Sequence, residues 1–134
     1  MFRKYMTEEQ SRRLKMEMWR NIHNGIRVEQ MYPNVVSIDI QYVLDHTSFA
    51  GKSHEERMWH ITPQNEIAFV LECLNRECTS IGFDLRNVIS SAIHSRQTVV
   101  SGEMDCEGQE APDHPEQSCD GHLNYTIKIT YRDF

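Results

Sequence analysis

The sequence has no long hydrophobic run, and its longest uninterrupted apolar stretch is the five-residue segment 67–71. A helix that crosses a bilayer needs roughly 18 consecutive apolar residues, so we expect no membrane span. Residues 1–5 are basic, but the hydrophobic segment that a secretory signal requires does not follow them. We therefore expect a cytoplasmic protein, in which thiols stay reduced.

The sequence motifs of several enzyme classes are also missing. There is no Gly-x-Gly-x-x-Gly or Walker pattern for binding phosphates, no Gly-x-Ser-x-Gly nucleophile elbow and no Cys-x-x-Cys redox motif. Asp45, His46 and Ser48 contain the residue types of a hydrolase triad, but neighbours on one loop rarely reach the required hydrogen-bond geometry. The acidic residues Glu103, Asp105 and Glu107 do not follow the spacing of an EF-hand. We expect a protein that is not an enzyme.

Basic residues are too few for a protein that binds nucleic acid through its phosphates. The chain has 14 Lys and Arg against 20 Asp and Glu, a formal net charge of -6, whereas such a domain normally carries a basic surplus. The charge is uneven, because residues 1–30 carry a net charge of +3 and residues 103–120 contain seven acids and no Lys or Arg. This polarity indicates either a partner or second copy, or an N-terminal helix that rests beside its own acidic body.

What remains is the composition of an ordinary globular domain. The 134 residues are 39% hydrophobic and 25% charged, and a chain of this length can form one core but is short for two domains. We predict a single domain over residues 1–134. Residues 7–10 fit a capping box, and Leu14, Met18 and Ile22 then recur every four residues. This pattern predicts an amphipathic helix at about 7–24 that ends at Asn24 and Gly25.

Alternation of apolar and polar residues predicts the strands. The segments with this pattern are 36–44, 56–61, 98–106 and 123–131. Pro63 is expected to interrupt the second strand, because proline cannot donate to a ladder. After it, the segment 67–73 has apolar residues on both parities and is predicted as a more central strand. Asp84 is predicted as the N-cap of a second helix that ends near Ser95. In the order helix-β-β-helix-β-β, these elements predict an α+β fold: a four-stranded antiparallel or mixed sheet, with the helices packed on the sheet.

The four cysteines are the only concentrated chemistry, and they come in two pairs. Four residues separate Cys73 from Cys78, and twelve separate Cys106 from Cys119. If the strands ending in Cys73 and Cys106 run parallel, all four sulfurs meet at one edge of the sheet. Zn²⁺ is commonly held by four thiolates, and such a site would order the loops 74–82 and 107–118. The spacing is unusual for a zinc knuckle, although Gly108 and Gly121 follow Cys106 and Cys119 by two residues.

Other states of these cysteines stay open from the sequence. Cys73 and Cys106 lie on predicted core positions and can be reduced, unliganded apolar side chains. Local disulfides would join Cys73 to Cys78 and Cys106 to Cys119. His114 or His122 can replace a thiolate as a metal ligand.

Two kinds of function follow from these alternatives. The first is a small soluble non-enzymatic binding or interaction domain with a structural four-cysteine zinc site. Its partner would be a protein or a second copy, bound through the N-terminal helix or an exposed sheet edge. The second is a thiol-based redox sensor or enzyme that uses Cys78, which lies near Arg76. A biological role does not follow from the sequence.

Overall fold

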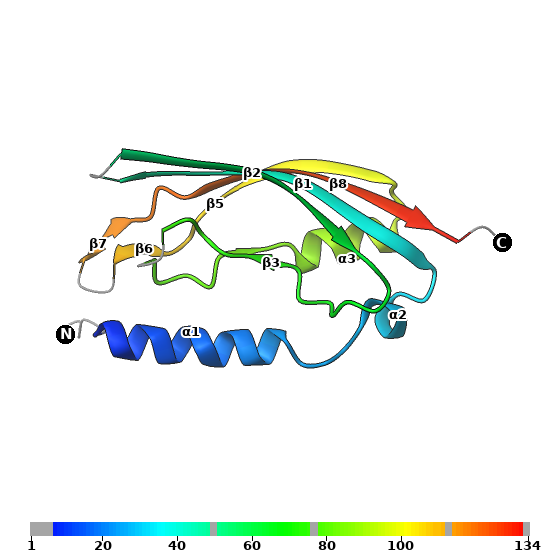
Figure 1. Cartoon of the computed structure of the whole chain (residues 1–134), viewed down its shortest axis with the longest axis horizontal. Helices are drawn as coiled ribbons and strands as arrows, with labels where there is room; N and C mark the ends of the chain where they lie inside the picture. The colour runs from blue at the N-terminus through cyan, green and yellow to red at the C-terminus, as the bar shows by residue number, and fades with distance from the viewer. Residues whose placement is uncertain (1–6, 49–50, 76–77, 112–113, 133–134) are drawn as a thin grey trace.

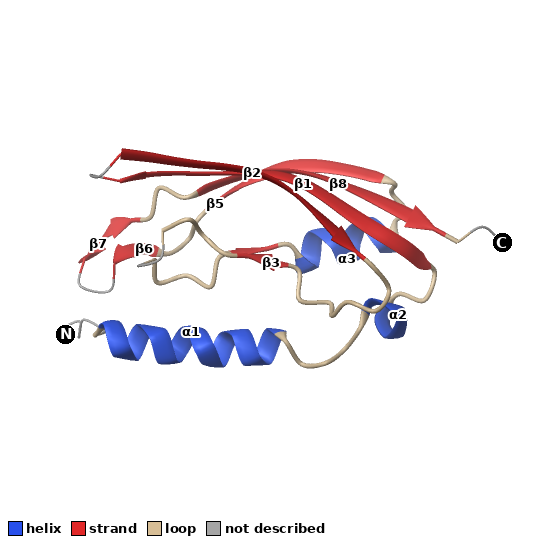
Figure 2. Cartoon of the chain, viewed as in Figure 1, coloured by secondary structure: helices blue, strands red, loops and turns tan. Residues whose placement is uncertain are grey.

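A four-stranded antiparallel sheet forms one layer of the molecule, and the helices lie on one side of it (Figures 1 and 2). The structure is a computed structural model that describes residues 7–48, 51–75, 78–111 and 114–132. The strand order is β2-β1-β8-β5, and every neighbouring pair is antiparallel. The fold is therefore a small α+β domain, as the sequence predicts.

A long hairpin forms half of this sheet. Strands β1 (Val35–Ser48) and β2 (Gly51–Ile61) pair in one continuous register, from Ile38 opposite Ile61 to Ser48 opposite Gly51. Strand β8 (His122–Tyr131) pairs with the other side of β1, and β5 (Val99–Asp105) pairs with β8 at the far edge. The predicted pairing of the last two strands is confirmed.

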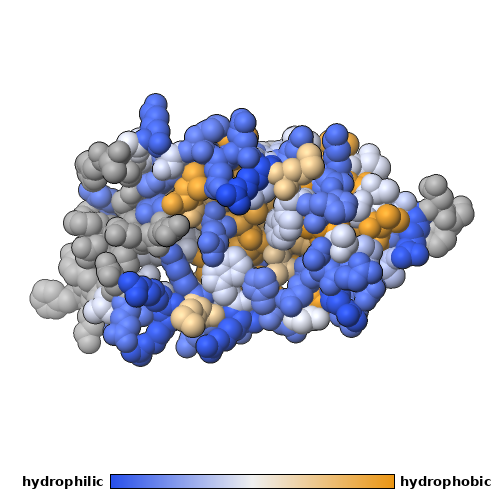
Figure 3. All heavy atoms as spheres, in the orientation of Figure 1, coloured by the Kyte–Doolittle hydropathy of each residue, from blue (hydrophilic) through white to orange (hydrophobic). Residues whose placement is uncertain are grey.

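One face of the sheet carries the core because its strands alternate as the sequence predicts. The residues of β1 and β8 that are buried on this face are Ile38, Ile40, Leu44, Leu123, Tyr125, Ile127 and Ile129. Helix α3 (Arg86–His94) buries Ile89 and Ala92 in the same cluster. Apolar residues therefore lie between the polar outer side of the sheet and the polar side of the helices, and they show in the middle of the space-filling view (Figure 3).

The predicted central strand at 67–73 is wrong. Only Val70–Leu71 is extended and paired, as β3, and its partner is the equally short β4 (Phe83–Asp84), outside the four-stranded sheet. Residues 68–71 are all buried, because this segment runs through the core between the sheet and the N-terminal helix. A segment that is buried on every side is apolar at every position, whatever its pairing.

The predicted element order also lacks several short elements. A four-residue helix α2 (Val28–Met31) precedes the sheet. A small hairpin of β6 (Gln109–Ala111) and β7 (His114–Ser118) lies between β5 and β8 in the chain and continues from the end of their ladder. The second helix occurs where predicted, but the predicted N-cap Asp84 is wrong, because Asp84 ends β4 and Leu85 is the N-cap. The carboxylate of Asp84 still accepts a hydrogen bond from the backbone N–H of Arg86.

The N-terminal helix α1 (Glu8–Ile22) begins with the predicted capping box between Thr7 and Gln10. Its buried side differs from the prediction. Ile22 is buried, but Leu14 and Met18 are 42% and 36% exposed. Ile22 and Trp19 pack on Ala68, Val70 and Ile81. Helix α1 therefore lies against β3 and the segment 72–82 that joins β3 to β4, here called the β3–β4 connection, rather than on the four-stranded sheet (Figure 1). Among the helices that the structure describes, none has the length and apolar character needed to span a bilayer.

Candidate metal centre

Two of the four cysteines lie on facing turns of one long hairpin. The ladder between β5 and β8 ends at Asp105 opposite His122, and the β6–β7 ladder begins at Gln109 opposite Ser118. Between these ladders, the backbone N–H of Cys106 donates to Gly121 O at 2.8 Å, and the N–H of Cys119 donates to Gly108 O at 3.0 Å. These two hydrogen bonds hold the backbones of the turns 106–108 and 119–121 against each other. Both turns have the sequence Cys-acid-Gly.

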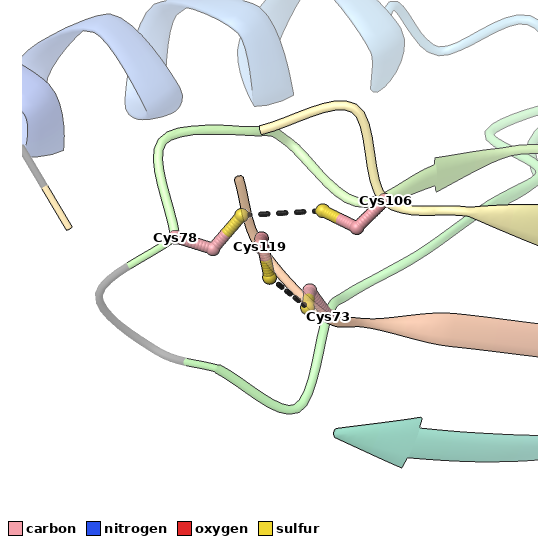
Figure 4. A group of neighbouring side chains, drawn as sticks. All are labelled: Cys73, Cys78, Cys106 and Cys119. Atoms are coloured by element: carbon pink, nitrogen blue, oxygen red, sulfur yellow. Dashed lines mark hydrogen bonds between the residues drawn. The ribbon is translucent and has the colours of Figure 1, made fainter. Parts of the chain in front are cut away.

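The other two cysteines come from the connection between β3 and β4. Cys73 follows β3 by two residues, and Cys78 begins the return of the chain toward β4. The backbone N–H of Cys78 donates to Asn75 O at 3.1 Å, and the N–H of Ser80 donates to the sulfur of Cys78 at 3.4 Å. This connection lies beside the hairpin turns and points its two thiols at theirs (Figure 4).

The four sulfur atoms form a compact cluster, in which all lie within 4.8 Å of one another. The sulfurs of Cys78 and Cys106 are 3.3 Å apart, and those of Cys73 and Cys119 are 3.6 Å apart. Four thiolates around Zn²⁺, with bonds of roughly 2.3 Å, form a tetrahedron with sulfur–sulfur edges of about 3.8 Å. The cluster therefore fits a tetrahedrally bound ion of this size after small side-chain movements.

Glycine at the third position of each turn allows this convergence. A Cβ atom on Gly108 would lie 2.5 Å from the sulfur of Cys78, and one on Gly121 would lie 2.7 Å from the sulfur of Cys73. Each hairpin turn thus packs its glycine on a sulfur from the β3–β4 connection. The sequence shows the two glycines, but only the structure shows that they make room for the opposite pair of thiols.

The protonation of the cluster shows why it suits a cation. Cys78, Cys106 and Cys119 are buried and Cys73 is half-buried, and all four are free thiols. Hydrogen bonds with Cys73 and Cys78 lower the pKa of the Cys106 thiol, while hydrogen bonding to Cys106 raises the pKa of Cys73 and of Cys78. Without a cation, one thiolate therefore keeps its neighbours protonated. A bound dication removes this conflict, because it stabilises several thiolates at once.

The structure brings together all four cysteines that the sequence singles out. The predicted reason, two parallel strands ending at Cys73 and Cys106, is wrong, because β3 lies outside the main sheet and that sheet is antiparallel throughout. The closest sulfurs also do not follow sequence neighbours. Each close pair joins one cysteine of the β3–β4 connection to one of the hairpin (Figure 4).

The alternative ligand His122 pairs with carboxylates and does not belong to the group of converging sulfurs. Its Nδ1 lies 2.7 Å from a carboxylate oxygen of Asp105, and its Nε2 lies 3.4 Å from one of Glu103. The hydrogen bond with Asp105 raises the pKa of His122. The side chain of His114 lies outside the structural description, as does Arg76, the predicted neighbour of Cys78. Within the described ranges, the four cysteines are the only group of His, Cys, Asp or Glu with the geometry to hold a metal ion.

Asp45, His46 and Ser48, which have the residue types of a hydrolase triad, do not form a catalytic site among the described side chains. Asp45 and His46 point to opposite faces of β1, and His46 is buried. Asp45 instead pairs with His54 across the β1–β2 hairpin at 2.5 Å, and this hydrogen bond raises the pKa of His54. The side chain of Ser48 lies outside the description.

Three cross-strand histidine–aspartate pairs lie on the outer face of the sheet and were not predicted from the sequence. They are His54–Asp45, His60–Asp39 and His122–Asp105. The partners in each pair are 9 to 21 residues apart, so only the strand register brings them together. The alternation of the strands was the one available signal that these residues share a face.

Comparison with known proteins gives no relative. No protein-family model matches the chain, and neither a curated protein nor a solved structure matches it. The functional assignment therefore rests on the geometry of the chain itself.

Proposed function

We propose that this chain is a small non-enzymatic binding domain with a structural Zn²⁺ site formed by Cys73, Cys78, Cys106 and Cys119. The observation that carries the proposal is the convergence of four thiol sulfurs within 4.8 Å of one another. A tetrahedral site with four protein thiolates is closed, because no position is left for water or substrate, and closed sites serve structure. An all-sulfur ligand set favours zinc or iron over the hard cations.

A metal is also useful at this place in the fold. The Cys-acid-Gly turns lie beyond the end of the β5–β8 ladder, and the β3–β4 connection lies beside them. Among their described residues, the buried ones are cysteines and Gly121, and no large apolar side chain is buried. Ordering such loops costs conformational entropy that only contacts between them can offset. One ion bound to two sulfurs from each segment would supply that link.

The binding role is assigned to the open parts of the sheet. Strands β2 and β5 are its two edges, and edge strands present backbone groups with which another chain can pair. The outer face beside them carries a hollow lined by Gln41, Val43, Met58, Asn124 and Thr126, among others. A protein partner or a second copy of the chain would bind at these surfaces.

The experiment is metal analysis of protein that is purified under reducing conditions, with light scattering on the same sample. We expect about one zinc per 15.8 kDa chain, and a Cys106→Ser variant should lose the metal. An Asp120→Ala variant, changed at an exposed residue next to Cys119, should keep it. Folded, fully reduced protein without bound metal would contradict the zinc site, while the scattering mass reports whether two chains associate.

A further inference from the structure

We propose that the four-cysteine centre is also a redox-responsive site, in which two peroxide molecules, one for each disulfide, join Cys73 to Cys119 and Cys78 to Cys106 and the metal is released. This inference rests on the proposed zinc site and adds its regulation. The pairing itself comes from the geometry of the sulfurs, so it can be tested separately from the metal.

Two short sulfur–sulfur contacts favour these two pairs. The sulfurs of Cys78 and Cys106 are 3.3 Å apart, and those of Cys73 and Cys119 are 3.6 Å apart. A disulfide bond is about 2.05 Å long, so each pair needs to close by only about 1.5 Å. Both pairs cross between the β3–β4 connection and the hairpin turns (Figure 4). Oxidation would therefore close the same junction that the metal closes.

Cys73 is the cysteine of the cluster that is nearest to solvent. Cys73 is half-buried, whereas the other three cysteines are buried. Cys73 also lines a surface hollow of about 320 Å³, together with Lys15 and Trp19 of α1 and Asn75. A small peroxide fits a hollow of this size, so Cys73 is the sulfur that reacts first.

The chemistry balances with peroxide as the oxidant. The Cys73 thiolate attacks one peroxide oxygen, the O–O bond breaks, and the sulfur becomes a sulfenic acid while hydroxide leaves. The Cys119 thiolate then attacks that sulfur, the S–S bond forms, and a second hydroxide leaves. Two protons from solvent convert the hydroxides to water, so two thiolates lose two electrons and one peroxide gains them.

Metal release follows from the loss of ligands. A disulfide sulfur is a poor ligand compared with a thiolate, so the first bond removes half of the ligand set. A second peroxide converts Cys78 and Cys106 in the same way. Each new disulfide closes a long loop, with cysteines 46 and 28 residues apart, and long-loop disulfides stabilise folded chains. The oxidised, metal-free chain should therefore stay folded.

The test treats the purified, zinc-loaded full chain with hydrogen peroxide and follows zinc release with a chromogenic chelator. Remaining thiols are then alkylated, and the chain is digested without reduction and mapped by mass spectrometry. Cleavage after Arg76 separates Cys73 from Cys78, and cleavage after Glu107, Glu110 or Glu116 separates Cys106 from Cys119. We expect full zinc release, the pairs Cys73–Cys119 and Cys78–Cys106, and recovery with reductant and zinc.

Two outcomes would overturn the inference. The first is zinc that stays bound while peroxide is consumed, and the second is pairing of the sequence neighbours Cys73–Cys78 and Cys106–Cys119. A protein without zinc before oxidation would contradict the proposed function instead. In that case, mapping of the disulfides in the reduced and then oxidised chain would still decide the pairing.

Discussion

Removal of the metal under reducing conditions should lower the thermal midpoint of unfolding by about 10 °C or more, since a loss of a few kcal/mol produces such a shift in a domain of this size. The physical reason is that metal binding contributes directly to the folding free energy when the unfolded chain offers no preformed site. Without the metal the four thiols cannot all ionise, because a thiolate at Cys106 raises the pKa of Cys73 and of Cys78 in this mostly buried cluster. Differential scanning calorimetry with a zinc chelator measures the shift, with a phosphine as the reductant because thiol reductants bind zinc themselves.

The loss of stability after metal removal should be local, at the loops that carry the cysteines, before it affects the whole domain. The core residues of β1 and β8, such as Ile40 and Ile127, are fully buried on a sheet whose four strands contain none of the cysteines, so the sheet should persist without the metal. Hydrogen exchange should therefore rise first in the β3–β4 connection and the Cys-acid-Gly turns. Added Zn²⁺ should restore both the midpoint and the protection. An unchanged midpoint after complete metal removal would contradict a structural role.

Alanine at Gly108 or Gly121 should weaken zinc binding by about 10-fold to 100-fold, the usual size of effects from residues that position metal ligands. The new Cβ atom would lie 2.5 Å from the Cys78 sulfur in the first variant and 2.7 Å from the Cys73 sulfur in the second. Both distances are well below van der Waals contact, and the Cβ at position 108 would also lie 2.7 Å from the backbone nitrogen of Ser80. The thiols, or the connection that carries them, must therefore move away from the cluster. Competition with a chromogenic chelator measures the affinity.

Two kinds of control isolate this effect. Glu107→Ala and Asp120→Ala change the exposed middle residues of the same turns and should leave the affinity unchanged. Gly102→Ala places a Cβ 2.5 Å from the hydroxyl oxygen of Tyr125 on the same hairpin. It should cost about 1–3 kcal/mol of stability by overpacking with no change in zinc affinity. Equal affinity in the Gly108, Gly121 and control variants would show that the two glycines do not shape the site.

The regular elements of the fold could be predicted because their signals are local. The alternation in 36–44 and 123–131 reflects one buried and one wet face of a sheet, and the capping box at Thr7 and Gln10 depends on four consecutive residues. The segment 67–73 misled because a buried connection is as apolar as a central strand. The apolar stripe of α1 misled because Leu14 and Met18 are exposed although their spacing is helical.

The candidate site could be predicted in composition but not in geometry. The four cysteines of the chain make Cys73, Cys78, Cys106 and Cys119 the first ligand set to consider, with His114 or His122 as replacements. Their convergence depends on the hairpin register and on the course of the β3–β4 connection, both of which are long-range. The same holds for His60–Asp39, whose partners meet only through the register of β1 and β2.

X-ray absorption at the zinc edge of the reduced, metal-loaded protein tests the zinc assignment most directly. A zinc ion held by the four thiolates should give a single shell of four sulfur atoms at roughly 2.3 Å from the metal. We also expect the loss of this shell in the Cys106→Ser variant. A shell dominated by nitrogen or oxygen atoms, or one that is unchanged in that variant, would contradict a zinc ion held by these four cysteines.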